Sequence, residues 1–515
     1  MASTLTTPTL DSTPRAGTRS WIALAVLMLP VLLISVDNTV LSFAIPSISL
    51  ALTPSASELL WIIDIYPLVL AALLVPMGSM TDRFGRRKLL LIGSTGFAVV
   101  SAFAAFAPTA GALIGYRALL GLFGAMLMPA TLSLIRNLFL HPAQRRTAIA
   151  IWAAGFSGGA ALGPIVGGFI LEHFWWGAVF LMSVPVLVPL LILAPIFVPE
   201  SKDPNPGRID VWSILLSFGA MVPAIFGIKE IAQSGFSLLN LGLIVVGVAL
   251  AVVFVRRQMH RADPMMDVSL FKNPVFSGSV SANLLSIFAL VGFLYFITQH
   301  LQLVVGLSPT TAAYVLVPGL AITVVCGLLA AKLANHFRPS HLVVAGLLLN
   351  ATAFLIVFLN TSGSVMGIII AFAVLGAGVG TAETISNDLI LSAAPPAKAG
   401  AASAISETAY EVGSVLGTAV LGSILAASYR MNVTVPAGVS AAGQDTASQT
   451  LGGAIEVAGT LPAEQGQALL ESAKHAFDSG SGTVALVSVV LMLAAAVMCA
   501  FALRTAVSAP EPVDH

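Results

Sequence analysis

Long apolar stretches alternate with short polar connections along almost the whole chain. A helix that crosses a bilayer needs roughly 20 mostly apolar residues. Fourteen stretches meet this requirement, at residues 21–43, 59–78, 89–107, 111–137, 146–171, 176–198, 211–228, 238–255, 275–299, 309–331, 341–359, 364–391, 401–426 and 482–503. Barrel strands would instead alternate apolar and polar residues with a period of two. The pattern therefore predicts an all-α membrane protein with fourteen transmembrane helices.

The composition agrees with this prediction. Hydrophobic residues make up 57% of the chain and charged residues 9%, against about 25% charged residues in soluble domains. The net charge is zero, so nothing indicates a nucleic-acid partner. The two cysteines, Cys326 and Cys499, stand singly in apolar stretches, which predicts neither a disulfide framework nor a zinc site.

The basic residues are concentrated in the connections on one side of the predicted membrane. Of the 23 Lys and Arg residues, 19 lie on the side of the two termini. The other four are Arg117, inside a span, and Lys229, Arg430 and Lys474, which we place on the opposite side. Because cytoplasmic loops carry the excess of Lys and Arg, both termini are predicted to be cytoplasmic.

Two parts of the chain repeat one another. Residues 118–135 align without gaps on 373–390, and residues 162–171 align on 416–425. Such internal repeats are typical of transporters that work by alternating access. The repeat predicts a tail at 1–20, a six-helix bundle at 21–200, inserted linker helices at 201–260, a second six-helix bundle at 261–427 and 480–504, an outer loop or helical hairpin at 428–479, and a tail at 505–515.

Six carboxylates lie within the predicted spans: Asp37, Asp64, Glu383, Asp388, Glu407 and Glu411. An acid near the centre of a transmembrane helix costs about 2.5–3.5 kcal/mol, so it usually faces a cavity or a partner and marks an ion or substrate path. For Asp64 and Asp388 a snorkelling position near a helix end is equally compatible with the sequence.

Two spacings make these acids candidates for proton coupling. At a helical rise of about 1.5 Å per residue, Asp37 and Arg117 lie at the same depth, about 9 Å inside the outer face, where they can form an ion pair. Glu407 and Glu411 are one turn apart and share a helix face. Burial and a like charge both favour the protonated form of a carboxyl group. Such groups can exchange a proton for an organic cation, which is the basis of antiport.

The connection between the second and third spans carries a motif with fixed spacing. Gly78, Asp82, Arg83, Gly85 and Arg86 follow the pattern G-x-x-x-D-R-x-G-R. Here the chain resembles the major facilitator superfamily, whose hallmark is this loop. The resemblance covers essentially the whole chain and implies two pseudo-symmetric six-helix bundles that rock around a central cavity, with two inserted linker helices.

Two further motifs resemble the fourteen-helix drug:proton antiporters of that superfamily, which pump quaternary-ammonium compounds, ethidium and fluoroquinolones. Residues 36–46 keep the acid, Thr, Ala and Pro of the antiporter pattern, and the fifth span carries Gly159, Gly163, Pro164 and Gly167. In the fourth span Leu120 and Phe123 depart from the family's R-x-x-Q-G-x-G pattern. Glycines at every fourth residue let helices approach closely, so plain packing is an alternative reading of this ridge.

The resemblance implies roles for individual residues. Asp37 would be a proton or drug site, Arg117 its modulator, and Glu407 and Glu411 carboxylates of the drug cavity. Residues 309–331 lack the acid that some relatives use for divalent cations, so monovalent cations are expected. The implied protein is a functional monomer in the bacterial cytoplasmic membrane that needs no cofactor, only a proton gradient.

Aromatic side chains in the spans could stack on a planar cation. The candidates are Trp61, Phe156, Tyr295 and Tyr410, although packing or interface anchoring explains most such residues equally well. The outer loop at 428–479 is acidic and could attract cationic substrates, but its content of Ala, Gly, Ser and Thr favours a solvated cap.

Other functional classes are less compatible with the chain. It has no Gly-Lys dipeptide for a phosphate-binding loop and no H-E-x-x-H metal motif, so an ATP-driven pump and a metalloenzyme are not expected. Two alternatives remain: first a transporter of an endogenous lipid or metabolite, and second a channel.

Overall fold

A computed structural model describes residues 15–202, 210–235, 237–261, 264–360, 363–395 and 398–504. In these ranges the regular structure is helical throughout. The first half comprises α1 (Thr18–Leu52), α2 (Ala56–Phe84), α3 (Arg86–Ala104), α4 (Ala110–Leu138), α5 (Pro142–His173), α6 (Ala178–Leu181) and α7 (Ser183–Phe197). The inserted pair comprises α8 (Val211–Ser234) and α9 (Leu238–His260).

The second half begins with a short 3-10 helix, η2 (Val268–Lys272). Its long helices are α10 (Pro274–Gln299) with the π-helical turn η3 (His300–Val304), α11 (Pro309–Leu333), α12 (Pro339–Leu359), α13 (Val365–Ala393), α14 (Ala399–Leu416) with the π-helical turn η5 (Gly417–Gly422), α15 (Ser423–Asn432) and α18 (Ala463–Ala502). Two short helices precede α18, α16 (Ala441–Gln449) and α17 (Leu451–Thr460).

Every predicted span coincides with one helix or with consecutive helical elements, as 176–198 does with α6 and α7 and 401–426 with α14, η5 and α15. Thirteen helical segments of the described residues are long and apolar enough to cross a membrane. The remaining predicted span, 146–171, coincides with α5, some of whose side chains lie outside the described part of the structure. The all-α transmembrane architecture is therefore confirmed.

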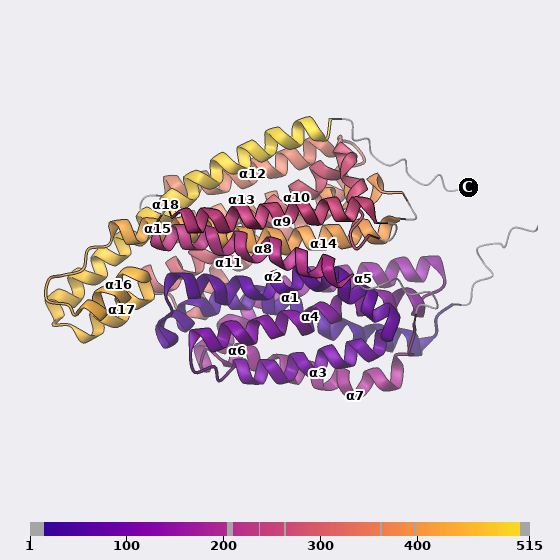
Figure 1. The fold of residues 1–515 in the computed structure, drawn as a ribbon, viewed down its shortest axis with the longest axis horizontal. Coiled ribbons are helices and arrows are strands. Elements are labelled where there is room, and N and C mark those ends of the chain that lie inside the picture. Colours follow the sequence, from indigo (N-terminus) through magenta and orange to yellow (C-terminus); the bar gives the residue numbers. More distant parts are fainter. Residues whose placement is uncertain are drawn as a thin grey trace, which may run out of the picture.

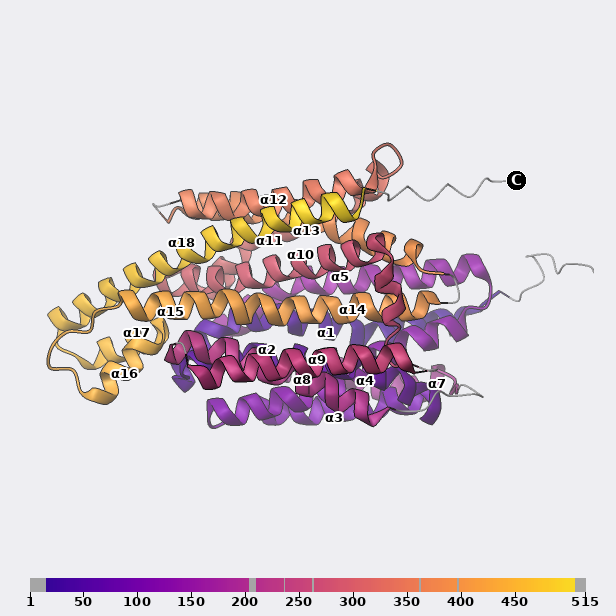
Figure 2. The same cartoon turned by 45° about the horizontal axis from the view of Figure 1, so that its top comes forward.

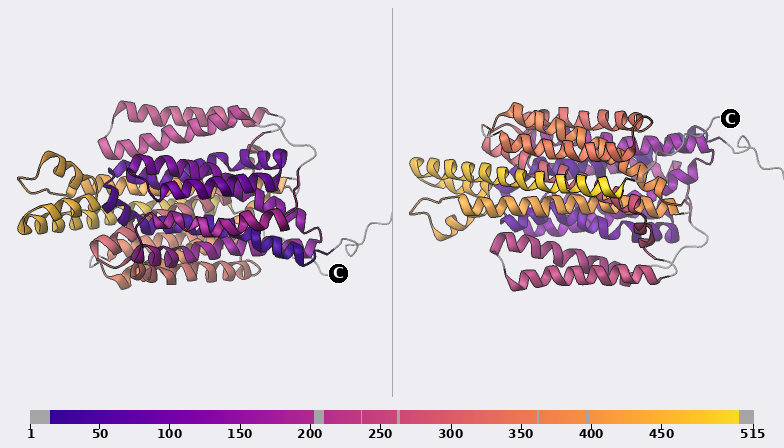
Figure 3. Two further views of the ribbon diagram at one scale, coloured as in Figure 1. Left: turned by 90° about the horizontal axis from the view of Figure 1, so that it is seen from below. Right: turned by 90° about the horizontal axis from the view of Figure 1, so that it is seen from above.

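The helices run roughly parallel to one long axis and form two layers (Figure 1). Helices α1–α7 form the lower layer of that view, and α10–α15 with α18 form the upper one. The pair α8 and α9 lies together along one side of the bundle (Figures 2 and 3). Helix α1 begins and α18 ends at the same end of the bundle, which we call the terminal end, while α16 and α17 project at the opposite end, the hairpin end (Figure 1).

The outer surface of the bundle is apolar, as a lipid-facing surface requires. On α9, for example, Leu238, Val245 and Val252 are 82%, 59% and 46% exposed. Helices are suited to this environment because they satisfy their backbone hydrogen bonds internally. Residues 428–479, predicted as a loop or hairpin, contain α16, α17 and the first part of α18; the division into domains stays a prediction.

The two halves repeat one close helix contact. A Cβ atom at Gly159 would meet the Leu32 carbonyl oxygen of α1 at 3.0 Å, and one at Gly413, the equivalent position 254 residues later, would meet the Leu284 carbonyl oxygen of α10. These glycines let α5 lie against α1, and α14 lie against α10, at backbone distance. The glycine ridge of α5 therefore has a packing role.

Replacing Gly163 by Ala is expected to lower the thermal stability of the purified protein. The added methyl group would lie against Thr39 and at 3.2 Å from the Val36 carbonyl oxygen, and overpacking of this kind costs about 1–3 kcal/mol. The control is Gly158→Ala on the same helix, where the added Cβ atom meets nothing within 4 Å. Equal melting temperatures for the two variants would contradict the close α1–α5 contact.

The inserted pair is fastened at its terminal end by an ionic cluster. Asp210 caps the first turn of α8 by accepting from the Ser213 backbone N–H. Its carboxylate also lies 3.0 Å from Arg257 Nη2 and 2.9 Å from Arg261 Nη1. Burial opposes ionisation, but the hydrogen bonds from Arg257 and Ser213 outweigh it and lower the pKa of Asp210 below its ordinary value. The start of α8 is thus tied to the end of α9.

Candidate functional site

The ion pair expected between Asp37 and Arg117 is present in the interior of the first half. Arg117 Nη1 of α4 lies 3.1 Å from Asp37 Oδ2 of α1, and both side chains are buried. Arg117 Nε also donates to the Ile62 carbonyl oxygen at 3.1 Å. The guanidinium carbon lies 4.7 Å from the centroid of the Tyr66 ring, a cation–π contact. One arginine thus joins α1, α2 and α4.

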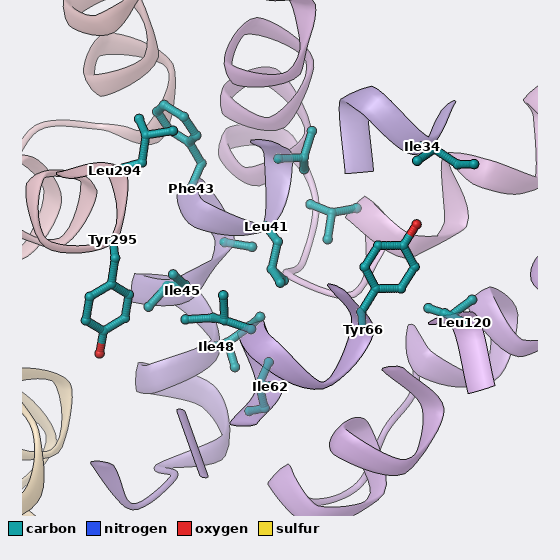
Figure 4. Packing of buried hydrophobic residues seen from close by; sticks show 14 of the residues in the cluster. Ile34, Leu41, Phe43, Ile45, Ile48, Ile62, Tyr66, Leu120, Leu294 and Tyr295 are labelled. Atoms are coloured by element: carbon teal, nitrogen blue, oxygen red, sulfur yellow. The ribbon is translucent and has the colours of Figure 1, made fainter. Parts of the chain in front are cut away.

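A glycine on α4 makes this arrangement possible. A Cβ atom at Gly121 would lie 2.7 Å from the Tyr66 carbonyl oxygen and 2.9 Å from Val69 Cβ. Only glycine lets α4 approach α2 so closely, one turn from Arg117. The Tyr66 ring lies beside Leu120 in Figure 4, and both residues are fully buried. The leucine that departs from the family pattern therefore serves the packing around Tyr66.

The structure corrects the prediction for Lys229 and decides between the two readings of Asp64. Lys229 does not lie on an outer connection: it is inside α8, 1% exposed, with Nζ 2.8 Å from Asp64 Oδ2. Asp64 is 0% exposed and is not a snorkelling residue. Lys229 was misplaced because α8 continues six residues beyond the predicted apolar span, to Ser234. The buried carboxylate of Asp64 compensates the charge of Lys229, so α8 continues past the point where the apolar pattern ends.

The four acids of the second half differ in exposure along the bundle. Glu411 is buried at 6% exposed, Glu407 and Glu383 are half-buried, and Asp388 is exposed. None of the four forms an ion pair with a basic side chain of the described residues. The second half therefore holds an excess of carboxylates, unlike the first, where Asp37 and Asp64 are both paired.

The acids of α14 face the first half of the chain. Glu407 interacts electrostatically with Arg136 of α4, and Glu411 with Tyr66 of α2 and with Glu407. Helices α2 and α14 also pack against one another. Because Tyr66 contacts Arg117 and is within electrostatic range of Glu411, its ring lies between the Asp37–Arg117 pair and the acids of α14. The hydroxyl of Tyr66 is buried without a hydrogen-bond partner in the described part of the chain.

The predicted aromatic residues do not form one cage. Tyr410 lies within electrostatic range of Glu383 and Glu411, whereas Tyr295 of α10 lies near Asp64 and against Gly422. Trp61 covers the Lys229 ammonium group, whose Nζ is 4.0 Å from the ring centroid. The side chain of Phe156 lies outside the described residues.

The motif loop between α2 and α3 joins two segments of the first half at the terminal end. Gly85 turns the chain with φ +116°, and Arg86 Nη2 pairs with Asp82 Oδ1 at 2.6 Å. The Glu200 carboxylate accepts from the backbone N–H groups of Arg87 and Lys88, both at 3.0 Å. The loop therefore binds the start of α3 to the segment after α7.

Of the other motif residues, Gly78 accepts a hydrogen bond from Thr81 through its carbonyl oxygen, and Arg83 is exposed. Pro164 lies inside α5 and is buried. No role in transport follows from these positions alone.

Hydrogen bonds between the two halves gather at the hairpin end. Gln302 donates to the Phe43 carbonyl oxygen at 3.2 Å, and Ser308 donates to Glu172 at 3.3 Å. Apolar contacts reinforce this closure, because Phe43 of α1 lies against Leu294 of α10 (Figure 4). These contacts hold the two halves together at the hairpin end. The half-buried Glu407 and exposed Arg136 lie towards the other end.

Comparison with known proteins agrees with this architecture. The family model described as Major Facilitator Superfamily matches residues 27–418. The chain belongs to the major facilitator superfamily. A bacterial homologue of the human lysosomal transporter Spinster, solved in an inward-facing conformation, has a TM-score of 0.67 at 17% identity, covering 96% of this chain and 100% of that one. The likeness to this solved structure shows the fold.

Two relatives define the branch of the superfamily. The chain is 55% identical to the multidrug efflux pump LfrA of Mycolicibacterium smegmatis, over 96% of this chain and 98% of that protein. It is 36% identical to the methyl viologen resistance protein SmvA of Salmonella typhimurium, over 92% and 96% of the two chains. The resemblance to the multidrug efflux family is confirmed, and this major facilitator protein is a multi-pass membrane transporter of small molecules, not an enzyme.

Sequence reasoning placed Lys229 outside the membrane and named Tyr66 only among the aromatic residues that could stack on a planar cation. Lys229 lies one turn after Ile225 on the same face of α8, and this spacing could have indicated a side chain that points inward. The position of Tyr66 between the halves depends on tertiary contacts that have no sequence signature. Within the described residues no group of three or more His, Cys, Asp or Glu side chains is arranged to hold a metal ion.

Proposed function

We propose that this chain is a proton-coupled antiporter that expels lipophilic organic cations, such as quaternary ammonium compounds, ethidium-like dyes and fluoroquinolones. One observation carries the proposal. Glu407 and Glu411 face the first half across the interface and form no ion pair among the described residues, Arg136 being within electrostatic range of Glu407 only. Uncompensated acids in this position can hold either protons or a cationic substrate.

The chemistry of the site supports exchange between these two cargoes. When the two glutamates are ionised, their charges attract a cation; when the cation leaves, desolvation and mutual repulsion favour the return of protons. Tyr410 lies close enough to Glu411 to offer an aromatic face to the bound cation. The relative SmvA is named for resistance to methyl viologen, which is itself an organic cation, and this supports the substrate class.

In the proposed transport cycle the two halves are first in contact at the hairpin end. Substrate enters from the terminal end, which we place in the cytoplasm on the distribution of Lys and Arg, and binds to the acids of α14. Rocking of the two halves then opens the hairpin end, and protons from outside displace the cation. In this proposal Asp37 is a further proton site controlled by Arg117, the proton gradient is the energy source, and the monomer in the cytoplasmic membrane is the working unit.

Transport in proteoliposomes tests this function. With an acidic lumen, outward proton flow is expected to drive ethidium accumulation by the native chain. An ionophore that collapses the pH gradient should abolish this accumulation. Ethidium that equilibrates equally with and without the gradient would favour a channel or a facilitator, and the absence of any ethidium movement would favour an endogenous lipid or metabolite as the substrate.

A further inference from the structure

The inserted helix α8 places a charged group at the contact between the two halves. At this point α8 packs against α2 of the first half and against η5 and α15 of the second. Leu68 of α2, Ile225 of α8 and Val415 and Ala419 of the second half form one small buried apolar cluster. Lys229, one turn beyond Ile225, brings its ammonium group to Asp64 beside this cluster. The inserted pair is therefore attached to the moving parts of the transporter.

The groups around the Lys229 ammonium have the chemistry of an organic-cation site. Asp64 supplies a carboxylate 2.8 Å from Nζ, and Trp61, on the same face of α2, supplies an indole ring 4.0 Å from it. A carboxylate with an aromatic face and apolar walls is how proteins recognise quaternary ammonium and similar cations. In this conformation a cation of the protein itself occupies the place.

The pair is buried but incompletely bonded. Lys229 Nζ lies 2.8 Å from Asp64 Oδ2, and the Thr418 side chain is a second polar neighbour of the carboxylate, but neither carboxylate oxygen nor Nζ has a hydrogen bond of good geometry to the described residues. A buried ion pair is stabilising only when further hydrogen bonds satisfy its remaining atoms. A substrate cation that makes the same contacts can therefore replace the ammonium group without leaving the buried carboxylate unpaired.

The position of the pair links it to the motion of the halves. Thr418 of η5 lies beside Asp64, so the carboxylate has neighbours from the first half, the inserted pair and the second half. Among the described residues, the other base that interacts electrostatically with Asp64 is Arg117, and Arg117 is bound to Asp37. If α2 and η5 separate during transport, Lys229 can either move away with α8 or remain paired with Asp64. Arg117 cannot take its place because it stays bound to Asp37.

We propose that Asp64 and Trp61 form a second site for lipophilic organic cations, and that Lys229 of α8 is a tethered cation that occupies this site in the conformation closed at the hairpin end. Withdrawal of Lys229 with α8 exposes the carboxylate and the indole ring to substrate. The inserted helices thus act as a built-in competitor. The inference rests on the proposed function only in taking an organic cation as substrate.

Equilibrium binding of ethidium to the purified protein, followed by fluorescence anisotropy, tests the inference. Lys229→Met keeps the apolar stem and removes the tethered charge, so its affinity for ethidium is expected to rise at least about fivefold over the native chain, because removal of an internal competitor restores the intrinsic affinity. The gain should disappear when Asp64→Asn or Trp61→Leu is added. Lys332→Met, which removes an exposed lysine at the end of α11, is the matched control and should bind as the native chain does.

Two outcomes would overturn the inference. One is a folded Lys229→Met variant whose affinity equals that of the native chain, and the other is a gain that persists in Lys229→Met/Asp64→Asn. If Lys229→Met is not recovered folded, Lys229→Gln, whose amide can still donate to Asp64, replaces it with the same expectation. Failure of the proposed function would instead appear as the absence of gradient-driven ethidium transport by the native chain, which this difference in equilibrium binding does not measure.

Discussion

Replacing Glu411 by Gln is expected to abolish proton-driven accumulation of ethidium in proteoliposomes while leaving the protein folded. Glu411 is 6% exposed, lies next to Glu407 and interacts with Tyr66 across the interface. The amide cannot exchange a proton, but it has the size of the acid and removes a costly buried charge. The rate should fall by at least tenfold, which corresponds to about 1.4 kcal/mol.

Asp388→Asn is the matched control for this prediction. Asp388 lies on α13 and is exposed, and it makes no ion pair with the described residues. Its neutralisation should change the transport rate little. Equal loss of transport in the two variants would show that total negative charge matters and that the position of Glu411 does not.

The second large effect is expected on stability, from Arg117→Ala. This substitution leaves Asp37 buried without its partner and removes the hydrogen bond to the Ile62 carbonyl oxygen. Removing one member of a buried ion pair costs about 3–5 kcal/mol. The melting temperature in detergent should fall clearly, and Asp37→Asn/Arg117→Ala should recover part of the loss because the unpaired charge is gone.

The control for this prediction is Arg256→Ala, which removes an exposed arginine near the end of α9 and should leave the melting temperature within experimental error. A double variant that is no more stable than Arg117→Ala would contradict the account, because the loss would then come from the Tyr66 and Ile62 contacts and not from the unpaired charge. Neither Arg117→Ala nor Asp37→Asn/Arg117→Ala is expected to transport ethidium at the native rate.

The fold could be predicted from the sequence because a bilayer imposes a simple rule. Each span must hide its backbone in a helix and present apolar side chains, so the fourteen stretches and the repeat with offsets of 254 and 255 residues are legible in the sequence. The depth argument that pairs Asp37 with Arg117 succeeded for the same reason, because helices of known rise and direction fix the level of each side chain.

The site was predictable only in part, because charge compensation is a tertiary property. The apolar rule ended the seventh span before Lys229, although the side chain is buried against Asp64. The spacing from Ile225 to Lys229 indicates only which way Lys229 points, and it does not identify Asp64 on another helix as its partner. The same limit applies to Tyr66, whose pattern predicts an ordinary packing residue until its contact with Arg117 and its electrostatic interaction with Glu411 are known.

Proton release on cation binding tests the central claim most directly. If protons and organic cations compete for Glu407 and Glu411, adding ethidium to purified native protein in weakly buffered detergent solution should acidify the solution in proportion to the cation bound. Glu407→Gln/Glu411→Gln should release no protons, whereas Asp388→Asn should behave as the native chain does. Cation binding to the native protein without any proton release would contradict the account.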